Sequence, residues 1–452
     1  MCRGCRSRPR ARPAPADGNS LQRNSFLRLT PRYPAAWSLG IDDQAMGGSQ
    51  NWKVPSYKPS SQSGETCLKW FYLHFDRGIA MTLPAGSKPL PITESPFLTL
   101  HELVKKARQK LNHDNWDYIV GGTETETTVR RNRLALDSIA FRPRVLRDVS
   151  HIDASTQFLG RSLRLPIVLA PVGGLENFTS EAGAAAAKAA QEFGVAHMLS
   201  SVCEPGLEAV AQQAPEALRI FQLYVHGDAD WVDAIAARAI AAGYGAFCLT
   251  VDTALYSRRE RDLAKRNIRR HNVPGREFQA QLNWSDVARL KKKFAIPLIL
   301  KGIATAEDAE CSMAHGVDMI YVSNHGGRQL DHGRGAMDVL PEIVATVAGR
   351  VPVIVDGGFN RGADIVKAIA AGADLVGIGR MQCVGLAADG QSGLVRVLEI
   401  LEQEIRTCLG LLGVNTWAEL DRTYLHAAPP VSDMGATLGA FPLLCLEEKS
   451  FY

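Results

Sequence analysis

The chain has 452 residues, of which 46% are hydrophobic and 22% are charged. This composition allows a large buried core and excludes a fibrous or wholly disordered protein, and the length leaves room for up to about three domains. No run of 18 uncharged apolar residues occurs, which argues against a transmembrane helix. The formal charge of +4 gives no indication of a nucleic-acid partner.

The positive charge is concentrated at the head of the chain. Residues 1–40 contain eight arginines and one acidic residue, a net charge of +7, whereas the rest of the chain carries −3. Because residues 1–95 lack hydrophobic periodicity and are rich in Arg, Pro and Ser, we expect a disordered extension, or an artefact of an upstream start with Met46 or Met81 as the natural one. A transit peptide and a nucleic-acid or membrane arm are the alternatives.

Nine cysteines are scattered along the chain. An odd and dispersed set argues against a disulfide framework and for a reducing compartment, so we expect a cytoplasmic protein. Cys2 and Cys5 form a CxxC pair, but no second pair or nearby histidine accompanies them. We therefore expect no metal site.

A folded domain is expected from residue 96 to residue 430, followed by a C-terminal tail over 431–452. Thr99 or Ser95 can cap a helix through LHELVKKARQKL. Short apolar runs then alternate with Ala-rich helical patterns. These runs lie at 165–172, 196–201, 219–225, 246–253, 297–303, 319–326, 351–358 and 374–380.

Eight buried-type strands, each followed by a helix pattern, predict an α/β fold of the (β/α)₈ TIM-barrel type with a short N-terminal helical cap. A doubly wound open sheet is the alternative. No G-x-G-x-x-G occurs at a first strand–helix turn, which weakens that alternative.

Seven of the eight predicted strands end in polar groups that a buried strand does not need. In a barrel these ends all lie on the face that carries active sites. An unpaired buried polar group costs about 1–3 kcal/mol, so their regular placement predicts a functional site. These residues are Ser200, Gln222, Tyr224, Thr250, Asp252, Lys301, Ser323, His325, Asp356 and Arg380.

The segment DGGFNRGADIVKAI predicts a phosphate site. Gly357 and Gly358 let backbone N–H groups approach an anion at the start of a helix. The next strand ends in Gly379 and Arg380, and the loops after strands seven and eight are the usual phosphate site of a barrel. Lys301 on the barrel interior needs an anion, either a reduced flavin or an internal carboxylate such as Asp356.

The segment SNHGGRQLD places His325 and Arg328 three residues apart. A histidine accepts a proton near neutral pH, and an arginine binds a carboxylate with two hydrogen bonds. Asp252 can orient the imidazole, and Arg258 and Arg259 offer a second carboxylate contact. Tyr118 and Tyr224 supply hydroxyl groups. Together these residues predict oxidation next to a carboxylate, with a phosphate-bearing cofactor.

From about residue 97 to 430 the chain resembles the FMN-dependent α-hydroxy acid oxidase and dehydrogenase family, which includes glycolate oxidase, lactate oxidase and mandelate dehydrogenase. The resemblance is carried by SNHGGRQLD and by FQLYV, LTVDT, LKGI, DGG and IGR in the same order. It implies FMN-dependent oxidation of an L-α-hydroxy acid to the α-keto acid. It also implies reoxidation of the flavin by oxygen, a quinone or another carrier, and a homo-oligomer, either a tetramer or an octamer.

The resemblance also implies individual roles. His325 would be the general base, with Asp252 and Tyr224 completing the catalytic group. Arg259, Arg328, Tyr118 and Tyr224 would bind the substrate. FMN would be held by Pro171, Val172, Gly173, Ser200, Gln222, Thr250, Lys301, Ser323, Asp356, Gly357, Gly358, Asn360, Arg361, Gly379 and Arg380.

The sequence departs from the family pattern at three places, and each departure leads to an expectation about the site or the chain. Asn360 stands where many members have Arg, so phosphate contact is expected to shift to Arg361 or Arg380. Gly173 replaces a common Ala and Val202 is small, which predicts a larger pocket and a bulkier substrate than glycolate. The segment between Arg259 and Trp284 is polar, unlike that of membrane-bound relatives. An FMN-barrel isomerase and a non-catalytic flavin-binding protein are the alternative functions.

Overall fold

The computed structural model describes residues 95–266, 274–430, 440–441 and 444. The chain divides into two units, Met1–Ala85 and Gly86–Tyr452, and all described residues belong to the second. The expected N-terminal extension, apart from Ser95, and most of the expected C-terminal tail lie outside the described residues.

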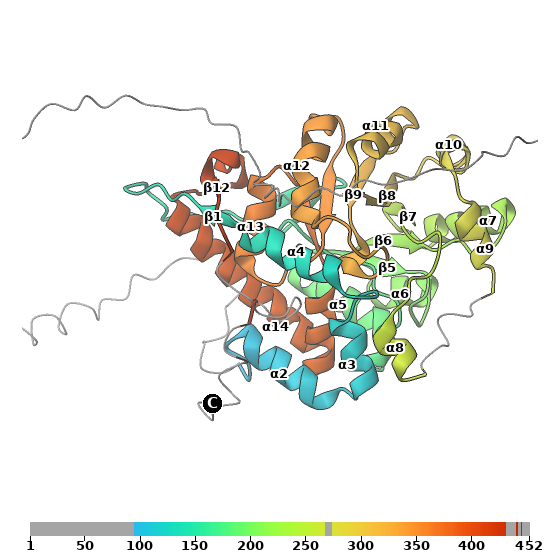
Figure 1. Cartoon of the computed structure of the whole chain (residues 1–452), viewed down its shortest axis with the longest axis horizontal. Helices are drawn as coiled ribbons and strands as arrows, with labels where there is room; N and C mark the ends of the chain where they lie inside the picture. Colours follow the sequence, from blue (N-terminus) through green and yellow to red (C-terminus); the bar gives the residue numbers. More distant parts are fainter. Residues whose placement is uncertain (1–94, 267–273, 431–439, 442–443, 445–452) are drawn as a thin grey trace, which may run out of the picture. The chain divides into compact units, whose positions relative to one another are not determined.

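The second unit opens with three helices, α2 (Leu100–Lys110), α3 (His113–Val120) and α4 (Thr127–Asp137). Helix α2 begins after Thr99, whose hydroxyl accepts the N–H of Glu102 while the Glu102 carboxylate accepts the N–H of Thr99 at 2.8 Å. This reciprocal cap confirms one of the two predicted helix starts. The buried face of α2 packs on α14 (Arg380–Leu412), which is kinked at Asp389 and Gly390 (Figure 1).

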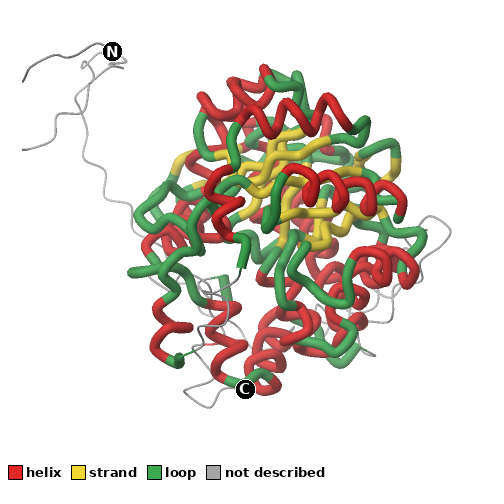
Figure 2. The backbone as a smooth tube through the Cα atoms, turned by 90° about the vertical axis from the view of Figure 1, so that its right-hand side faces the viewer, coloured by secondary structure: helices red, strands yellow, loops and turns green. Residues whose placement is uncertain are grey.

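Eight parallel strands then close into a barrel, as predicted. The ring runs from β4 through β11 and back to β4. Figure 2 shows the strands enclosed by helices. The strands are β4 (Ile167–Leu169), β5 (Ala196–Ser200), β6 (Leu218–Leu223), β7 (Ala246–Thr250), β8 (Leu298–Ile303), β9 (Met319–Val322), β10 (Val353–Asp356) and β11 (Leu375–Ile378).

Helices connect successive strands and cover the barrel, because each strand buries side chains on both faces. The helices after β4, β5 and β6 are α5 (Ala182–Phe193), α6 (Leu207–Gln213) and α7 (Ala229–Ala241). The connection from β7 to β8 carries α8 (Glu260–Ala264), α9 (Arg276–Gln281) and α10 (Trp284–Lys293). The remaining connections carry α11 (Ala306–Ala314), α12 (Ala336–Val347) and α13 (Gly362–Ala370).

The barrel interior is filled by one cluster of side chains that includes Met198, Ile220, Ile299 and Tyr321. A small hairpin of β2 (Thr156–Phe158) and β3 (Arg161–Leu163) precedes the barrel, and its Phe158 and Leu163 join this cluster beside residues from the first positions of several strands. The hairpin therefore closes the N-terminal end of the barrel and leaves the carboxyl ends of the strands for the site.

Two further short strands join distant parts of the chain. Strand β1 (Ile139–Phe141) pairs antiparallel with β12 (Leu425–Ala427). None of the helices in the described ranges is long and apolar enough to cross a bilayer.

Candidate active site

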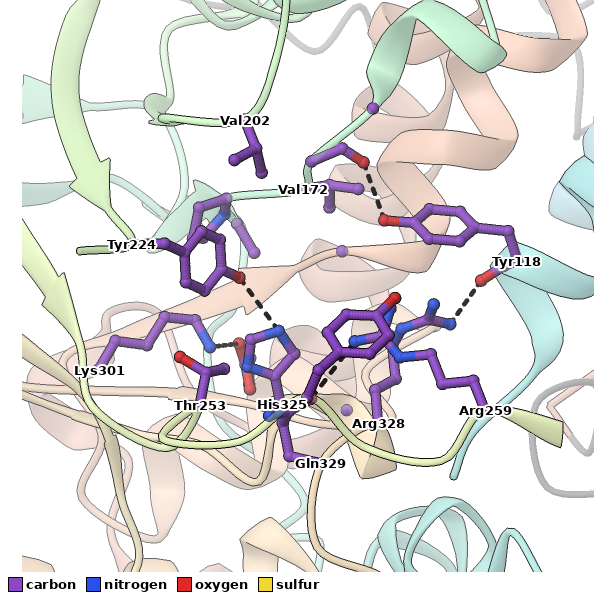
Figure 3. A pocket seen from close by; sticks show the side chains of 18 of the residues that line it. Tyr118, Val172, Val202, Tyr224, Thr253, Arg259, Lys301, His325, Arg328 and Gln329 are labelled. Atoms are coloured by element: carbon purple, nitrogen blue, oxygen red, sulfur yellow. Dashed lines mark hydrogen bonds and ion pairs between the residues drawn. The ribbon is translucent and has the colours of Figure 1, made fainter. Parts of the chain in front are cut away.

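A cavity of about 930 Å³ opens at the carboxyl ends of the barrel strands. Its wall combines the loop after β4 with loops after β7, β9 and β10 and with the start of α14. Figure 3 shows Tyr224, His325, Arg259 and Arg328 gathered around it. The structure thus brings together, from distant parts of the chain, most of the residues that the sequence singles out.

His325 is held by both of its ring nitrogens. Nδ1 lies 3.0 Å from Asp252 Oδ1, and Nε2 lies 3.2 Å from the Tyr224 hydroxyl (Figure 3). The backbone N–H of His325 donates to Ser323 Oγ at 3.0 Å, and its φ of 57° is left-handed. A non-glycine residue in this region is strained, and such strain clusters at functional sites. With Nδ1–H donating to Asp252, Nε2 is left as the acceptor that faces the cavity.

The surroundings keep this histidine neutral and its partner ionised. Burial, helped by the positive charges of Lys301 and Arg259, lowers the pKa of His325 despite the opposing effect of Asp252. Burial alone would raise the pKa of Asp252, but the neighbouring His325 and Lys301 outweigh it and hold that pKa below its ordinary value. The site therefore contains a neutral imidazole supported by a carboxylate, as general-base chemistry requires.

Two arginines face the cavity next to this pair. Arg328 donates to the carbonyl groups of Tyr118 (2.5 Å) and Gly121 (3.1 Å), and its guanidinium lies 4.4 Å from the Tyr118 ring centre. Burial lowers its pKa to about 10, so it remains charged at neutral pH. Arg259 is buried and lies 4.4 Å from the ring centre of Tyr256. Arg258 is instead 68% exposed at its side chain, where it pairs with Glu260, so it offers no second carboxylate contact.

Arg380 also lines the cavity, and within the described ranges none of Arg259, Arg328 and Arg380 forms an ion pair with a carboxylate. Asp356 and Glu126 lie near enough to Arg380 to oppose the effect of burial on its pKa. Uncompensated buried charge is costly, so the arrangement is suited to anionic ligands.

Lys301 lines the cavity and also meets an internal carboxylate. Its Nζ lies 3.0 Å from Asp356 Oδ2 and donates to Ser323 Oγ at 2.7 Å, and the Ser323 hydroxyl donates to Asp356 Oδ1 at 2.6 Å. Burial opposes the charge on Lys301, but the negative charges of Asp356 and Asp252 raise its pKa above the ordinary value. The ammonium group is therefore permanently charged at the edge of the cavity.

The predicted phosphate end lies at β10 and β11. Gly357 and Gly358 have φ values of 115° and 90°, and together with Asn360 and Gly379 they line the cavity. Arg380 joins them from the start of α14, where its guanidinium donates to the carbonyl groups of Ile119 (2.9 Å), Gly121 (3.0 Å) and Gly326 (2.9 Å).

The position of Arg361 corrects one expectation. Its guanidinium turns away from the cavity, pairs with Glu404 on α14 and donates to the carbonyl of Ala440 at 3.3 Å. The reason is that the Glu404 carboxylate lies at the start of α13, where it pairs with the guanidinium and also accepts the N–H of Gly362 at 2.7 Å. Among the two residues expected to replace the missing arginine, only Arg380 reaches the cavity.

The next three expected cofactor contacts lie at the ends of β5, β6 and β7. Gln222 Nε2 donates to Thr250 Oγ1 at 2.9 Å, and Ser200 Oγ accepts the N–H of Val202 at 3.4 Å. Gln222 Oε1 is buried without a hydrogen-bond partner among the described residues. Such an orphan acceptor suits an N–H of a flavin ring, just as Arg380 with the glycine amides suits a phosphate. The residues present therefore fit FMN.

Pro171, Val172 and Gly173 line the cavity as expected, but the space at Gly173 differs from the expectation. A methyl group on Gly173 would come within 2.6 Å of Val202 Cγ2. The Val202 side chain thus fills the space of the missing methyl, and the loss of that methyl does not by itself enlarge the pocket. The Tyr118 hydroxyl donates to the Gly173 carbonyl at 2.9 Å and fixes this loop (Figure 3).

Sequence reasoning missed the contribution of α9. Gln279 accepts the N–H of Val225 at 2.7 Å and donates to the Thr250 carbonyl at 2.8 Å, so it bridges the ends of β6 and β7. The helical spacing of Phe278 and Leu282 could have indicated a short helix in this polar segment. Nothing in the local pattern marks Gln279 itself.

Comparisons with known proteins agree with this geometry. A profile of the family described as FMN-dependent dehydrogenase matches residues 107–274 and 264–427. An L-lactate oxidase of Nostoc sp. is 38% identical over 359 residues, which cover 73% of this chain and 98% of the relative. A peroxisomal (S)-2-hydroxy-acid oxidase of Oryza sativa subsp. japonica is 39% identical, over 72% of this chain and 93% of the relative.

Solved structures give the same result. The crystal structure of a mandelate oxidase superimposes with a TM-score of 0.68 at 34% identity, and the match covers 73% of this chain and 98% of that one. The barrel, the cationic cavity and these matches extend over the same residues. The chain therefore belongs to the FMN-dependent dehydrogenase family of α-hydroxy acid oxidases, and it is an oxidoreductase of CH–OH donors with FMN as its cofactor.

Proposed function

We propose that the chain oxidises an L-α-hydroxy acid to the corresponding α-keto acid, with His325 as the general base. The observation that carries this proposal is the position of His325. Its Nε2 lies beside the Tyr224 hydroxyl, while Nδ1 is held by a buried carboxylate. The neutral state that its surroundings favour is the state in which a base can accept a proton.

The chain's own groups supply binding and proton transfer. Arg259 and Arg328 bind the substrate carboxylate, which supplies the missing counter-charge, and Tyr118 and Tyr224 contact the substrate. His325 then accepts a proton, and Asp252 stabilises the resulting imidazolium. FMN, when bound, would accept the two electrons and the second hydrogen that the substrate loses.

Lys301 and Arg380 serve the cofactor in this proposal. Lys301 places a positive charge where the reduced flavin is negative, and Arg380 with Gly357 and Gly358 meets the phosphate. The proposed cofactor-binding set is otherwise the one expected from the sequence, without the Arg361 side chain.

The side chain of the substrate is proposed to be bulkier than that of glycolate. Val202 lines the cavity with a small side chain that is 44% exposed, and the apolar Leu255 lies on the same wall. Oxygen is the proposed electron acceptor, since the similar proteins named above are oxidases.

A panel of hydroxy acids tests this function. The FMN-loaded protein is mixed without oxygen with glycolate, L-lactate, L-mandelate and a six-carbon L-hydroxy acid while flavin absorbance is followed, and oxygen is then admitted. We expect bleaching by the larger acids and rapid return of the yellow colour. If none of the acids bleaches the flavin, the result would favour a non-catalytic protein or an isomerase. Slow return of the yellow colour after oxygen is admitted would favour another electron acceptor.

Three broader assignments stay predictions. We propose that the folded domain runs from 96 to 430, a range supported by the pairing of β1 with β12 near its two ends. We also propose that the chain assembles into a tetramer or octamer and that it is located in the cytoplasm.

A further inference from the structure

Tyr321 lies at the centre of the barrel, close to the cavity and outside the catalytic group. It is the third residue of β9, and its side chain is fully buried in the interior cluster. Its hydroxyl makes no hydrogen bond of ordinary geometry within the described ranges, although it lies close enough to the Asp356 carboxylate to interact with it. A phenol is an expensive group to bury in this way, so its presence calls for a specific reason.

Gly377 on β11 makes room for this phenol. A Cβ atom on Gly377 would overlap the Tyr321 hydroxyl and would lie 3.1 Å from Asp356 Cβ. Glycine weakens a strand interior, and it often marks a close approach of another group. Tyr321 and Gly377 are thus fitted to each other, since any side chain at 377 would exclude the tyrosine.

The ring of Tyr321 lies next to Lys301. The two residues are register partners on the adjacent strands β9 and β8, and Lys301 Nζ lies 4.7 Å from the ring centre. The ammonium group therefore has three contacts: the Tyr321 ring, Ser323 Oγ and the Asp356 carboxylate. A cation over an aromatic face is held most strongly where water is excluded, as it is here.

We propose that Tyr321 is a positioning residue for Lys301, whose ammonium group its ring face holds at the edge of the cavity. Asp356 already contacts the ammonium group at 3.0 Å, so without the ring the group loses one of its three contacts and is free to move into the space that the ring leaves, away from the cavity. The positive charge that the cofactor experiences then falls. This inference rests on the proposed contact of Lys301 with FMN.

The flavin reduction potential tests the role without any substrate. The FMN-loaded full chain is equilibrated with a redox dye of known potential, and the ratio of reduced to oxidised flavin is read from absorbance. Tyr321→Phe keeps the ring, whereas Tyr321→Leu with Gly377→Ala removes the ring and refills part of its space. We expect about a tenfold lower ratio in the Leu/Ala variant and less than about a twofold change in Tyr321→Phe, the scale of one desolvated cation–π contact.

The same substitutions in a Lys301→Met background provide the control. If Tyr321 acts through Lys301, the Leu/Ala change has no further effect on the ratio there. Should the Leu/Ala protein fail to retain FMN, Tyr321→Met, which fills irregular space without an aromatic face, provides the same comparison.

An unchanged or higher ratio in the Leu/Ala variant would overturn the positioning role, and so would an equal fall in Tyr321→Phe. If Lys301→Met alone leaves the ratio unchanged, the proposed contact between Lys301 and FMN is wrong, and the inference is overturned with it. Substrate turnover enters none of these measurements, so failure of the proposed α-hydroxy acid oxidation would be seen separately, in the hydroxy acid panel.

Discussion

Asp252 Oδ1 lies 3.0 Å from His325 Nδ1, and this contact joins the end of β7 to the loop after β9. It fixes the tautomer in which Nε2 accepts a proton, and it places a negative charge beside the imidazolium that results. The proposed chemistry depends on this pair, because burial by itself would make the charged imidazole unfavourable.

Substitution of His325 tests its role as the base. His325→Asn is expected to retain yellow FMN but to lose substrate-driven bleaching by a factor of about 10² to 10⁴. Asparagine is chosen because it tolerates the left-handed backbone at φ 57°. The control is His332→Asn, since His332 has the same φ and a side chain that is 64% exposed. Bleaching by the His325 variant at the control's rate would exclude the role.

The pH dependence of kcat/KM follows from the direction of the His325 pKa. Activity requires the neutral imidazole, so kcat/KM should rise with pH through the pKa of His325 in the free enzyme. Because burial lowers this pKa, the midpoint of the rise is expected below the ordinary value of about 6.5. A midpoint above that value, measured with a substrate whose own ionisation is complete, would contradict the assignment.

Asp252→Asn is expected to shift that same midpoint further toward acid. The Asp252 charge is what opposes the effect of burial on His325, so its removal lowers the pKa of the imidazole again. The maximal rate should fall at the same time, because the imidazolium loses its stabilising charge. A pH–rate profile of kcat/KM with bound FMN measures both effects, and a midpoint displaced toward alkali would argue against the pairing.

Substitution of Arg328 tests whether binding of the substrate carboxylate requires a guanidinium group rather than only a positive charge. Arg328→Lys keeps the positive charge but loses the planar pair of donors, and we expect KM to rise and kcat/KM to fall by about 10²-fold. FMN content should be unchanged. Arg258→Lys is the matched control, because Arg258 lies in the same chain region with its side chain largely exposed. Equal kinetics in the two variants would refute the proposed carboxylate contact.

The barrel was predictable from the sequence because its strands are short, mostly apolar runs, and seven of the eight predicted strands end in polar residues. The hairpin of β2 and β3 was not, because its strands have only three residues each and alternate too briefly to be recognised. In the site, His325 was expected from its position just past a strand and Lys301 from its position at the end of one. The direction of the Arg361 side chain depends on Glu404, which lies on another helix, and no local pattern reveals it.

The contact between Gly173 and Val202 was equally hidden, since it joins the loops after β4 and β5, and it leads to the last prediction. Gly173→Ala places a methyl within 2.6 Å of Val202 Cγ2, so the single variant is expected to lose activity and thermal stability. Val202→Ala removes the clashing atom, and the double variant should regain both. If Val202 rather than Gly173 sets the room for the substrate, the double variant should also turn over L-mandelate faster, relative to L-lactate, than the unmodified protein does. Kinetics with the two acids and a thermal melt of each variant decide this, and a double variant no better than Gly173→Ala would show that the two residues do not compete for one space.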